Sequence, residues 1–215
     1  MRELTLNTDA FNRALSEFMA GSKREAVVVL KEQARGIMRN LFMVTPPGRA
    51  NISSSKARKK GRDNVKADAL KVVRPVTRNP EQSNVAALIK SHRRGGRVRH
   101  EVNPRITVPL DAFKAYIAKK QALVGFLASG WNEAAARLGV KPAAWIWQNE
   151  GPGDLQITIT ESGIRIVMTN KVKYASSISE LRSRLQWAVN QQRRAIERRL
   201  KRFHEEQARK AGFKT

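Results

Sequence analysis

The chain has 215 residues, of which 42 are Lys or Arg and 18 are Asp or Glu, so its net charge is +24 at pH 7. The sequence has no cysteine, which excludes disulfides and thiolate metal sites. It also has no apolar run near the roughly 18 residues of a membrane span and no signal-peptide stretch at its start, so we expect a protein of the cytoplasm or of an assembly formed there. So much positive charge favours a polyanion or an acidic protein surface as partner, with charge that merely aids solubility as the alternative.

Residues 1–47 are predicted to form two helices. Apolar residues recur at helical spacing in both, and Gly21 separates them. Ser22 and Glu25 have the spacing of a capping box for the second helix. Pro46 then ends it, because proline cannot continue a helix.

The next segment, residues 48–105, contains 16 basic and 4 acidic side chains. Residues 51–62 combine low hydrophobicity with high charge, which cannot offset the entropy lost on ordering, so they predict a mobile loop. Two short amphipathic pieces follow, near residues 67–73 and 81–91, and then a second basic cluster at residues 92–100. We therefore expect a basic, mostly irregular insertion.

A long helix is predicted from about Ala112 to Leu138, with apolar side chains on one broad face. Gly125 and Gly130 lie inside this pattern. Each costs a helix roughly 1 kcal/mol relative to Ala, so close packing against another helix is the expected reason for them. Gly139 suits a left-handed C-cap.

A β-hairpin is predicted at about residues 155–169. Apolar and polar residues alternate on both sides of a short turn that contains Gly163. A lone hairpin is only marginally stable, so it must pair further or pack on helices. Ser177 and Glu180 then form a second capping box that opens a long C-terminal helix, whose second half is rich in Arg and Lys and is expected to project past the fold.

Together these elements predict an α+β fold, in which helices pack on a small antiparallel sheet that contains the hairpin. Residues 1–47 would form the N-terminal helical part of the core domain, and residues 111–215 would complete it. Residues 48–110 would be a basic, partly disordered insertion between them.

No converging set of catalytic groups is predicted. His92, His100 and His204 lie in basic surroundings, and the acidic residues are scattered along the chain. We therefore expect no enzyme, no catalytic, cofactor-binding or metal site, and no small-molecule substrate. A nuclease whose acidic residues meet only in the fold is a minor alternative.

The basic clusters are the candidate polyanion contacts. Runs of Lys and Arg neutralise phosphates and release counterions, so their binding depends on salt and not on base sequence. A merely solvated charged surface is the alternative, above all for the C-terminal helix. The candidates are Lys56, Arg58, Lys59, Lys60, Arg62, Arg93, Arg94, Arg97, Arg99, Arg193, Arg194, Arg198, Arg199 and Arg202.

The tryptophans lie on apolar patterns and are not interleaved with the basic clusters, which argues against stacking on single-stranded bases. Trp145 and Trp147 stand beside a Gly-Pro-Gly sequence. Because tryptophan is enriched at interfaces, these two residues are candidates for a subunit interface, with core packing as the equal alternative.

Several short motifs occur in a fixed order along the chain. Thr45-Pro46-Pro47-Gly48 ends an early helix, residues 124–132 and 142–146 are apolar and rich in Gly and Ala, and residues 168–175 end in Tyr174-Ala175. This order resembles phage minor tail, tail-completion and head–tail joining (neck) proteins of long-tailed phages. The resemblance covers residues 22–47 and 120–200 best.

The resemblance implies a non-catalytic α+β protomer that assembles into a homo-oligomeric ring in the virion neck or tail. Its expected neighbours are portal, adaptor, tail-tube or terminator proteins, and assembly takes place in the host cytoplasm. The basic insertion, and Ser176-Ser177 in place of a glycine-rich continuation, depart from the family pattern. We expect contact with acidic neighbours or with DNA, without sequence preference. The alternative is a sequence-independent nucleic-acid-binding protein outside a virion.

Overall fold

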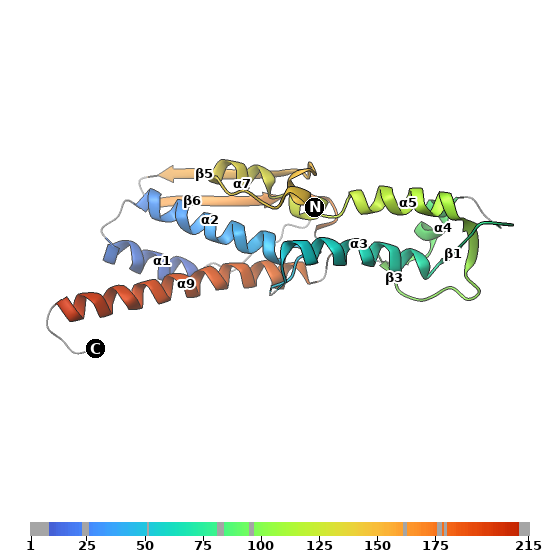
Figure 1. Cartoon of the computed structure of the whole chain (residues 1–215). Helices are drawn as coiled ribbons and strands as arrows, with labels where there is room; N and C mark the ends of the chain where they lie inside the picture. The colour runs from blue at the N-terminus through green and yellow to red at the C-terminus, as the bar shows by residue number, and fades with distance from the viewer. Residues whose placement is uncertain are drawn as a thin grey trace.

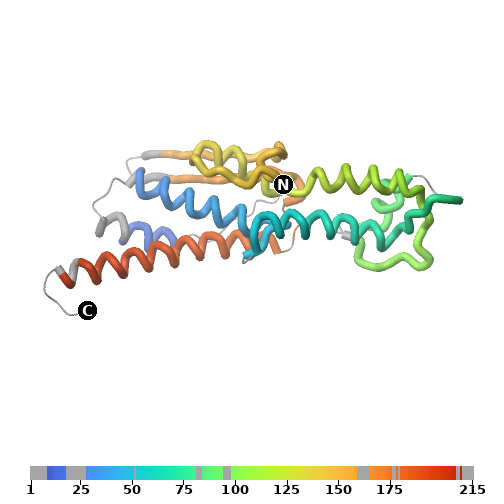
Figure 2. The backbone as a smooth tube through the Cα atoms, in the orientation of Figure 1, coloured from blue at the N-terminus to red at the C-terminus, as the bar shows by residue number. Residues whose placement is uncertain are grey.

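The computed structural model describes residues 9–22, 26–50, 52–80, 84–94, 97–160, 163–175, 178 and 180–210 (Figure 1). The molecule is elongated and has two halves. The chain enters one half through α3 (Ser54–Leu70) and leaves it through α5 (Leu110–Ala122). The two helices run side by side in opposite directions (Figure 2). We call residues 54–122 the arm and the other described residues the body.

The body packs three long helices against a two-stranded hairpin. Its elements are α1 (Asp9–Ser22), α2 (Ala26–Val44), α6 (Phe126–Ser129), α7 (Asn132–Leu138), α8 (Ala144–Trp147), β5 (Gly153–Thr160), β6 (Gly163–Asn170) and α9 (Leu181–Lys210). The apolar stripe of α2 includes Met38 and Leu41 and faces a core that also holds Leu155, Leu181 and Ile196. In Figure 1 the hairpin and α7 lie above α2, with α1 and α9 below it.

The predicted hairpin and the α+β class are confirmed. β5 and β6 pair antiparallel, with Leu155 opposite Met168 and Ile157 opposite Ile166. These four residues belong to the body core or pack against it. The inward face of the hairpin therefore gains from the helices the burial that an isolated hairpin lacks.

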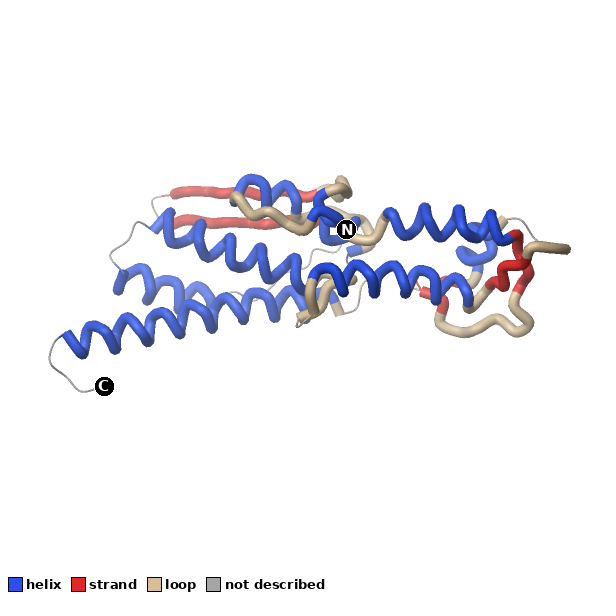
Figure 3. The backbone as a smooth tube through the Cα atoms, viewed as in Figure 1, coloured by secondary structure: helices blue, strands red, loops and turns tan. Residues whose placement is uncertain are grey.

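The arm has a hydrophobic core of its own. Its elements are α3 (Ser54–Leu70), β1 (Val73–Val76), α4 (Val85–Ser91), β2 (Arg93–Arg94), β3 (Arg97–Val98), β4 (Ile106–Pro109) and α5 (Leu110–Ala122). β1 and β4 pair in parallel, a pairing that the sequence did not predict, and these short strands lie at the end of the arm far from the body (Figure 3). The core includes Phe113 and Ile117 of α5, so the predicted boundary at residue 110 falls inside the arm.

The prediction of a mostly irregular insertion with a mobile loop at residues 51–62 is wrong, because α3 begins at Ser54. The Ser53 hydroxyl accepts a hydrogen bond from the Lys56 amide at 3.4 Å and caps this helix. Lys and Arg favour helix, and small residues at a spacing of four allow close packing against the rest of the protein. We call Ala57, Gly61 and Ala69, all buried, the inner stripe of α3.

The predicted continuous helix over residues 112–138 is also wrong. α5 ends at Ala122, and Gly125 adopts a φ of +103°, which breaks the helix. A Cβ at Gly125 would lie 2.7 Å from the ring of Trp145 in α8, so the close packing against another helix that was expected for this glycine is confirmed. The predicted left-handed C-cap at Gly139 is confirmed, with a φ of +69°.

The predicted long C-terminal helix is confirmed as α9, whose 30 residues give a length of roughly 45 Å. Its C-terminal end extends beyond α1 (Figure 1). The two predicted capping boxes depend on Glu25 and Ser177, which lie outside the described residues. None of the described helices is long and apolar enough to cross a membrane.

Candidate polyanion-binding surface

Helix α3 presents a basic face to solvent. Lys56, Lys59 and Lys66 are three and seven residues apart, which places them on the side opposite the inner stripe. Arg58 and Lys60 flank them, and all five side chains are exposed. We call Lys56, Arg58, Lys59, Lys60 and Lys66 the α3 basic face. Lys66 is not among the candidates predicted from the sequence, although the helical spacing identifies it once the helix is known.

The positive charge of this face is not compensated within the described part of the chain. No described carboxylate lies within 4.0 Å of a nitrogen of any α3 basic-face residue. Of the two acidic residues in α3, Asp68 is engaged by Lys71, whose Nζ is 3.7 Å from its Oδ1. The ordered backbone of α3 therefore displays a row of free cations, the arrangement that a phosphate backbone or an acidic surface would neutralise.

Arg62 differs from its neighbours because it links two helices. Its Nε and Nη2 donate to Gln121 Oε1 of α5 at 3.3 and 3.2 Å, and Gln121 Nε2 donates back to the Arg62 carbonyl at 3.1 Å. The link holds α3 beside α5. Arg62 thus has a structural function in addition to its predicted charge.

The second basic cluster lies next to the C-terminal end of α3. Lys71 Nζ donates to the carbonyl of Val98 in β3 at 3.1 Å, and β3 pairs with β2 so that Arg94 is opposite Arg97. Arg99 is exposed, and the side chains of Arg94 and Arg97 lie outside the described set. The fold therefore places both predicted clusters on the arm, the first in the N-terminal part of α3 and the second beside its C-terminal end.

Arg93 is the partly buried member of this cluster. Its Nε is buried and has no hydrogen-bond partner among the described residues. Burial raises the pKa of the neighbouring Tyr116 hydroxyl, and the positive charge of Arg93 partly offsets that rise. Lys120 Nζ stands 5.8 Å from the centre of the Tyr116 ring, within cation–π range.

The basic residues of α9 form a separate surface on the body. Arg194, Arg198, Arg199 and Arg202 are exposed. Unlike the α3 basic face, this helix carries its own partial neutralisation, because Arg193 Nη1 is 3.7 Å from Glu197 Oε1 and Lys201 Nζ is 3.8 Å from Glu205 Oε1. The predicted α9 contacts are thus not part of the arm surface, and two basic residues of α9, Arg193 and Lys201, lie within ion-pair distance of carboxylates.

The two candidate interface tryptophans have different environments on α8. Trp145 is buried against Gly125, and its Nε1 donates to Ser54 Oγ at 2.8 Å. It therefore packs where the arm joins the body. Trp147 is 51% exposed and stays a prediction as an interface residue.

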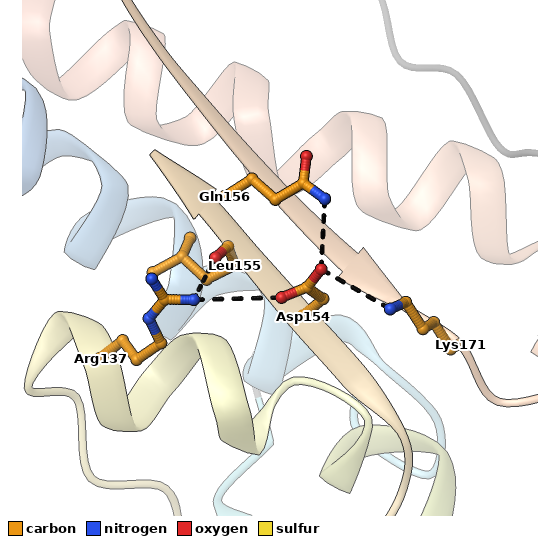
Figure 4. Close-up of polar contacts among 5 residues, drawn as sticks. All are labelled: Arg137, Asp154, Leu155, Gln156 and Lys171. Atoms are coloured by element: carbon orange, nitrogen blue, oxygen red, sulfur yellow. Dashed lines mark hydrogen bonds and ion pairs between the residues drawn. The ribbon is translucent and has the colours of Figure 1, made fainter. Parts of the chain in front are cut away.

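A carboxylate with several polar contacts, Asp154, lies on the hairpin and not on the arm (Figure 4). Lys171 Nζ and Arg137 Nη1 stand 3.6 and 4.0 Å from the two oxygens of Asp154, and Gln156 Nε2 donates to Asp154 Oδ2 at 3.3 Å. Arg137 also donates to the Leu155 carbonyl, which ties α7 to β5. The hydrogen bond from Gln156, with smaller contributions from the Leu155 amide and Lys171, lowers the pKa of Asp154.

No metal-binding cluster is formed by the described His, Asp and Glu side chains, taken in groups of three or more. His92 is engaged locally, because its Nδ1 is 2.8 Å from the Leu88 carbonyl and 3.0 Å from Ser91 Oγ. The exposed cations on the described part of the chain suit charge recognition. Comparison with protein-family models, curated proteins and solved structures finds no match to this chain.

Proposed function

We propose that this protein is a non-enzymatic structural component of a phage virion at the head–tail junction, in the neck or as a tail-completion protein. In this role it forms a ring with copies of itself and touches acidic neighbours or DNA through its basic arm. The observation that carries the polyanion contact is the α3 basic face, whose cations on an ordered helix have no carboxylate partner among the described residues. Contact of this kind is independent of base sequence, as any packaged genome requires.

The virion location is supported by the order of the motifs described above, and two of them contact a third in the fold. Trp131 Nε1 donates to Thr45 Oγ1 at 3.0 Å, and Asn170 Nδ2 donates to the Leu127 carbonyl at 2.8 Å. These residues fix the ends of α2 and β6 to the segment between α5 and α7. The resemblance therefore rests on residues that organise the body.

The polyanion contact is tested by replacing Arg58, Lys59 and Lys60 with Gln. These side chains are exposed, so the variant should fold normally but bind duplex DNA more weakly. Each phosphate contact contributes about 0.9 to the slope of log K against log salt, so the slope should fall by up to roughly 2.7. Fluorescence anisotropy with labelled duplex DNA over a salt series measures both quantities.

A matched control changes three exposed basic residues of the body, Arg165, Lys173 and Arg182, to Gln. This variant loses the same charge but should retain most of the affinity and the slope. Equal losses in the two variants would show that binding follows total charge alone, and the α3 basic face would lose its proposed role.

A further inference from the structure

We infer that a groove between the body and the arm binds an acidic segment of a neighbouring protein, which inserts an apolar side chain. The inference rests on the proposed role in an assembly, because it specifies the chemical character of one neighbouring protein. It concerns a different surface from the α3 basic face. Binding of DNA to the α3 basic face and binding of a protein segment to the groove can therefore be tested separately.

The groove has a volume of about 300 Å³ and is formed by three segments, of which the first two are neighbours in sequence and the third is far from them. They are the C-terminal half of α2 with the turn after it, the start of α3, and the stretch from Val140 to α8. Its lining residues are Arg39, Phe42, Met43, Gly48, Ile52, Ser54, Ala57, Val140, Lys141, Pro142, Ala143, Trp145 and Ile146. We call this the junction groove.

The floor of the junction groove is apolar. Trp145, Ile146 and Ala57 are buried beneath it in a small hydrophobic cluster, against which Phe42 and Ile52 pack. Met43, at the wall, is 41% exposed, and a flexible Met adapts readily to a partner side chain. A volume equal to roughly ten water molecules accepts one or two side chains, which is small for a cofactor site.

The charged groups of the groove all have one sign. Arg39 and Lys141 are exposed and line it, whereas none of the described acidic residues does. Neither cation has a carboxylate within ion-pair distance among the described residues. Charge complementarity therefore selects an occupant with Asp or Glu beside its apolar side chain.

The apolar floor distinguishes a protein segment from nucleic acid. A phosphate backbone would gain from the two rim cations alone, whereas an aliphatic or aromatic side chain also gains from burial on the floor. The occupant would contact α2 of the body and the first turn of α3 at the same time. Docking would thus hold the arm in one orientation relative to the body.

The test uses a short fluorescein-labelled peptide with one Leu between runs of Asp and Glu, and the full-length protein. Replacing the Leu with Ser removes the buried apolar group and should weaken binding about tenfold. The protein variant R39E/K141E should lose binding of the Leu peptide. The variant R13E/R165E, which makes the same charge change at exposed residues of α1 and β6, should bind it like the wild type.

Two results would overturn the inference. Equal affinity for the Leu and Ser peptides, or an equal loss in both protein variants, would reduce the binding to net charge. Full displacement of the peptide by duplex DNA, together with loss of DNA binding in R39E/K141E, would assign the groove to nucleic acid. Since R58Q/K59Q/K60Q leaves the groove intact, a failure of the DNA prediction leaves peptide binding unchanged, and the two failures are distinguishable.

Discussion

At the scale of single residues, three glycines allow the backbone to close tightly beside the hairpin. A Cβ at Gly153 would lie 1.9 Å from the Gly130 carbonyl oxygen, and one at Gly151 would lie 2.5 Å from Ser129 Oγ. At Gly130 it would lie 2.3 Å from Asn170 Oδ1. The obstacle at Gly153 is backbone and cannot swing aside, so this position tolerates no side chain.

Gly153→Ala should therefore lower the free energy of unfolding by about 1–3 kcal/mol, the usual cost of overpacking. Gly139→Asn is the matched control, because Gly139 has a φ of +69° that Asn adopts readily and has open space around it. Urea unfolding of both variants measures the two losses. An equal or larger loss in Gly139→Asn would contradict the packing argument.

Asp154 predicts a pH dependence. Its lowered pKa means that the folded protein favours the ionised carboxylate, so the stabilisation is complete above the ordinary value of 3.8 and disappears as pH falls through the folded pKa. Asp154→Asn should thus melt below the wild type at pH 7, and the difference should vanish in acid. Asp111→Asn, at a carboxylate that is 98% exposed, should show little difference at either pH. If the difference in melting temperature between Asp154→Asn and the wild type were the same at pH 7 and in acid, the proposed stabilisation by the ionised carboxylate would be refuted.

At the scale of elements, α2 and α9 share a partly buried polar pair. Gln33 is 1% exposed, and Gln192 Nε2 donates to its Oε1 at 2.6 Å. Gln192→Ala should cost about 1–3 kcal/mol of unfolding free energy, because it leaves the buried Gln33 amide without this partner. The double variant Q33L/Q192L should recover much of that loss in thermal and urea unfolding. If Gln192→Ala and Q33L/Q192L lowered the free energy of unfolding equally, the loss would come from packing and not from the hydrogen bond.

The elements that could be predicted from the sequence are those with a strong internal period. The alternation in β5 and β6 and the apolar stripe of α9 needed only local pattern. The start of α3 could not be predicted from local pattern. Its stability depends on an inner stripe of small residues whose partners, such as Val124 and Pro47 against Gly61, lie elsewhere in the chain. The break at Gly125 likewise depends on Trp145, which packs there only in the folded state.

The two candidate surfaces also differ in whether they could be predicted from the sequence. Consecutive Lys and Arg on α3 could be selected from composition, since exposure follows from their charge. The junction groove could not, because each of its three segments contributes a few ordinary apolar residues and the rim cations Arg39 and Lys141 stand alone in sequence. Only the fold brings them together.

At the scale of the whole molecule, the arm and the body differ in charge as well as in shape. The arm contains 18 basic and 5 acidic residues, so it carries 13 of the 24 net charges on about a third of the chain. The body carries the hairpin, the long helices and the motif residues that resemble neck and tail proteins. We expect the body to make the contacts between protomers and the arm to meet DNA or acidic neighbours.

The most direct test of this account is the mass of the purified protein by light scattering, with and without duplex DNA, at low and high salt. We expect a ring-sized species that persists at high salt without DNA, because contacts between bodies would not depend on neutralising the arm. A monomer that associates only on DNA, and dissociates as salt rises, would contradict it and favour a nucleic-acid-binding protein that acts outside a virion.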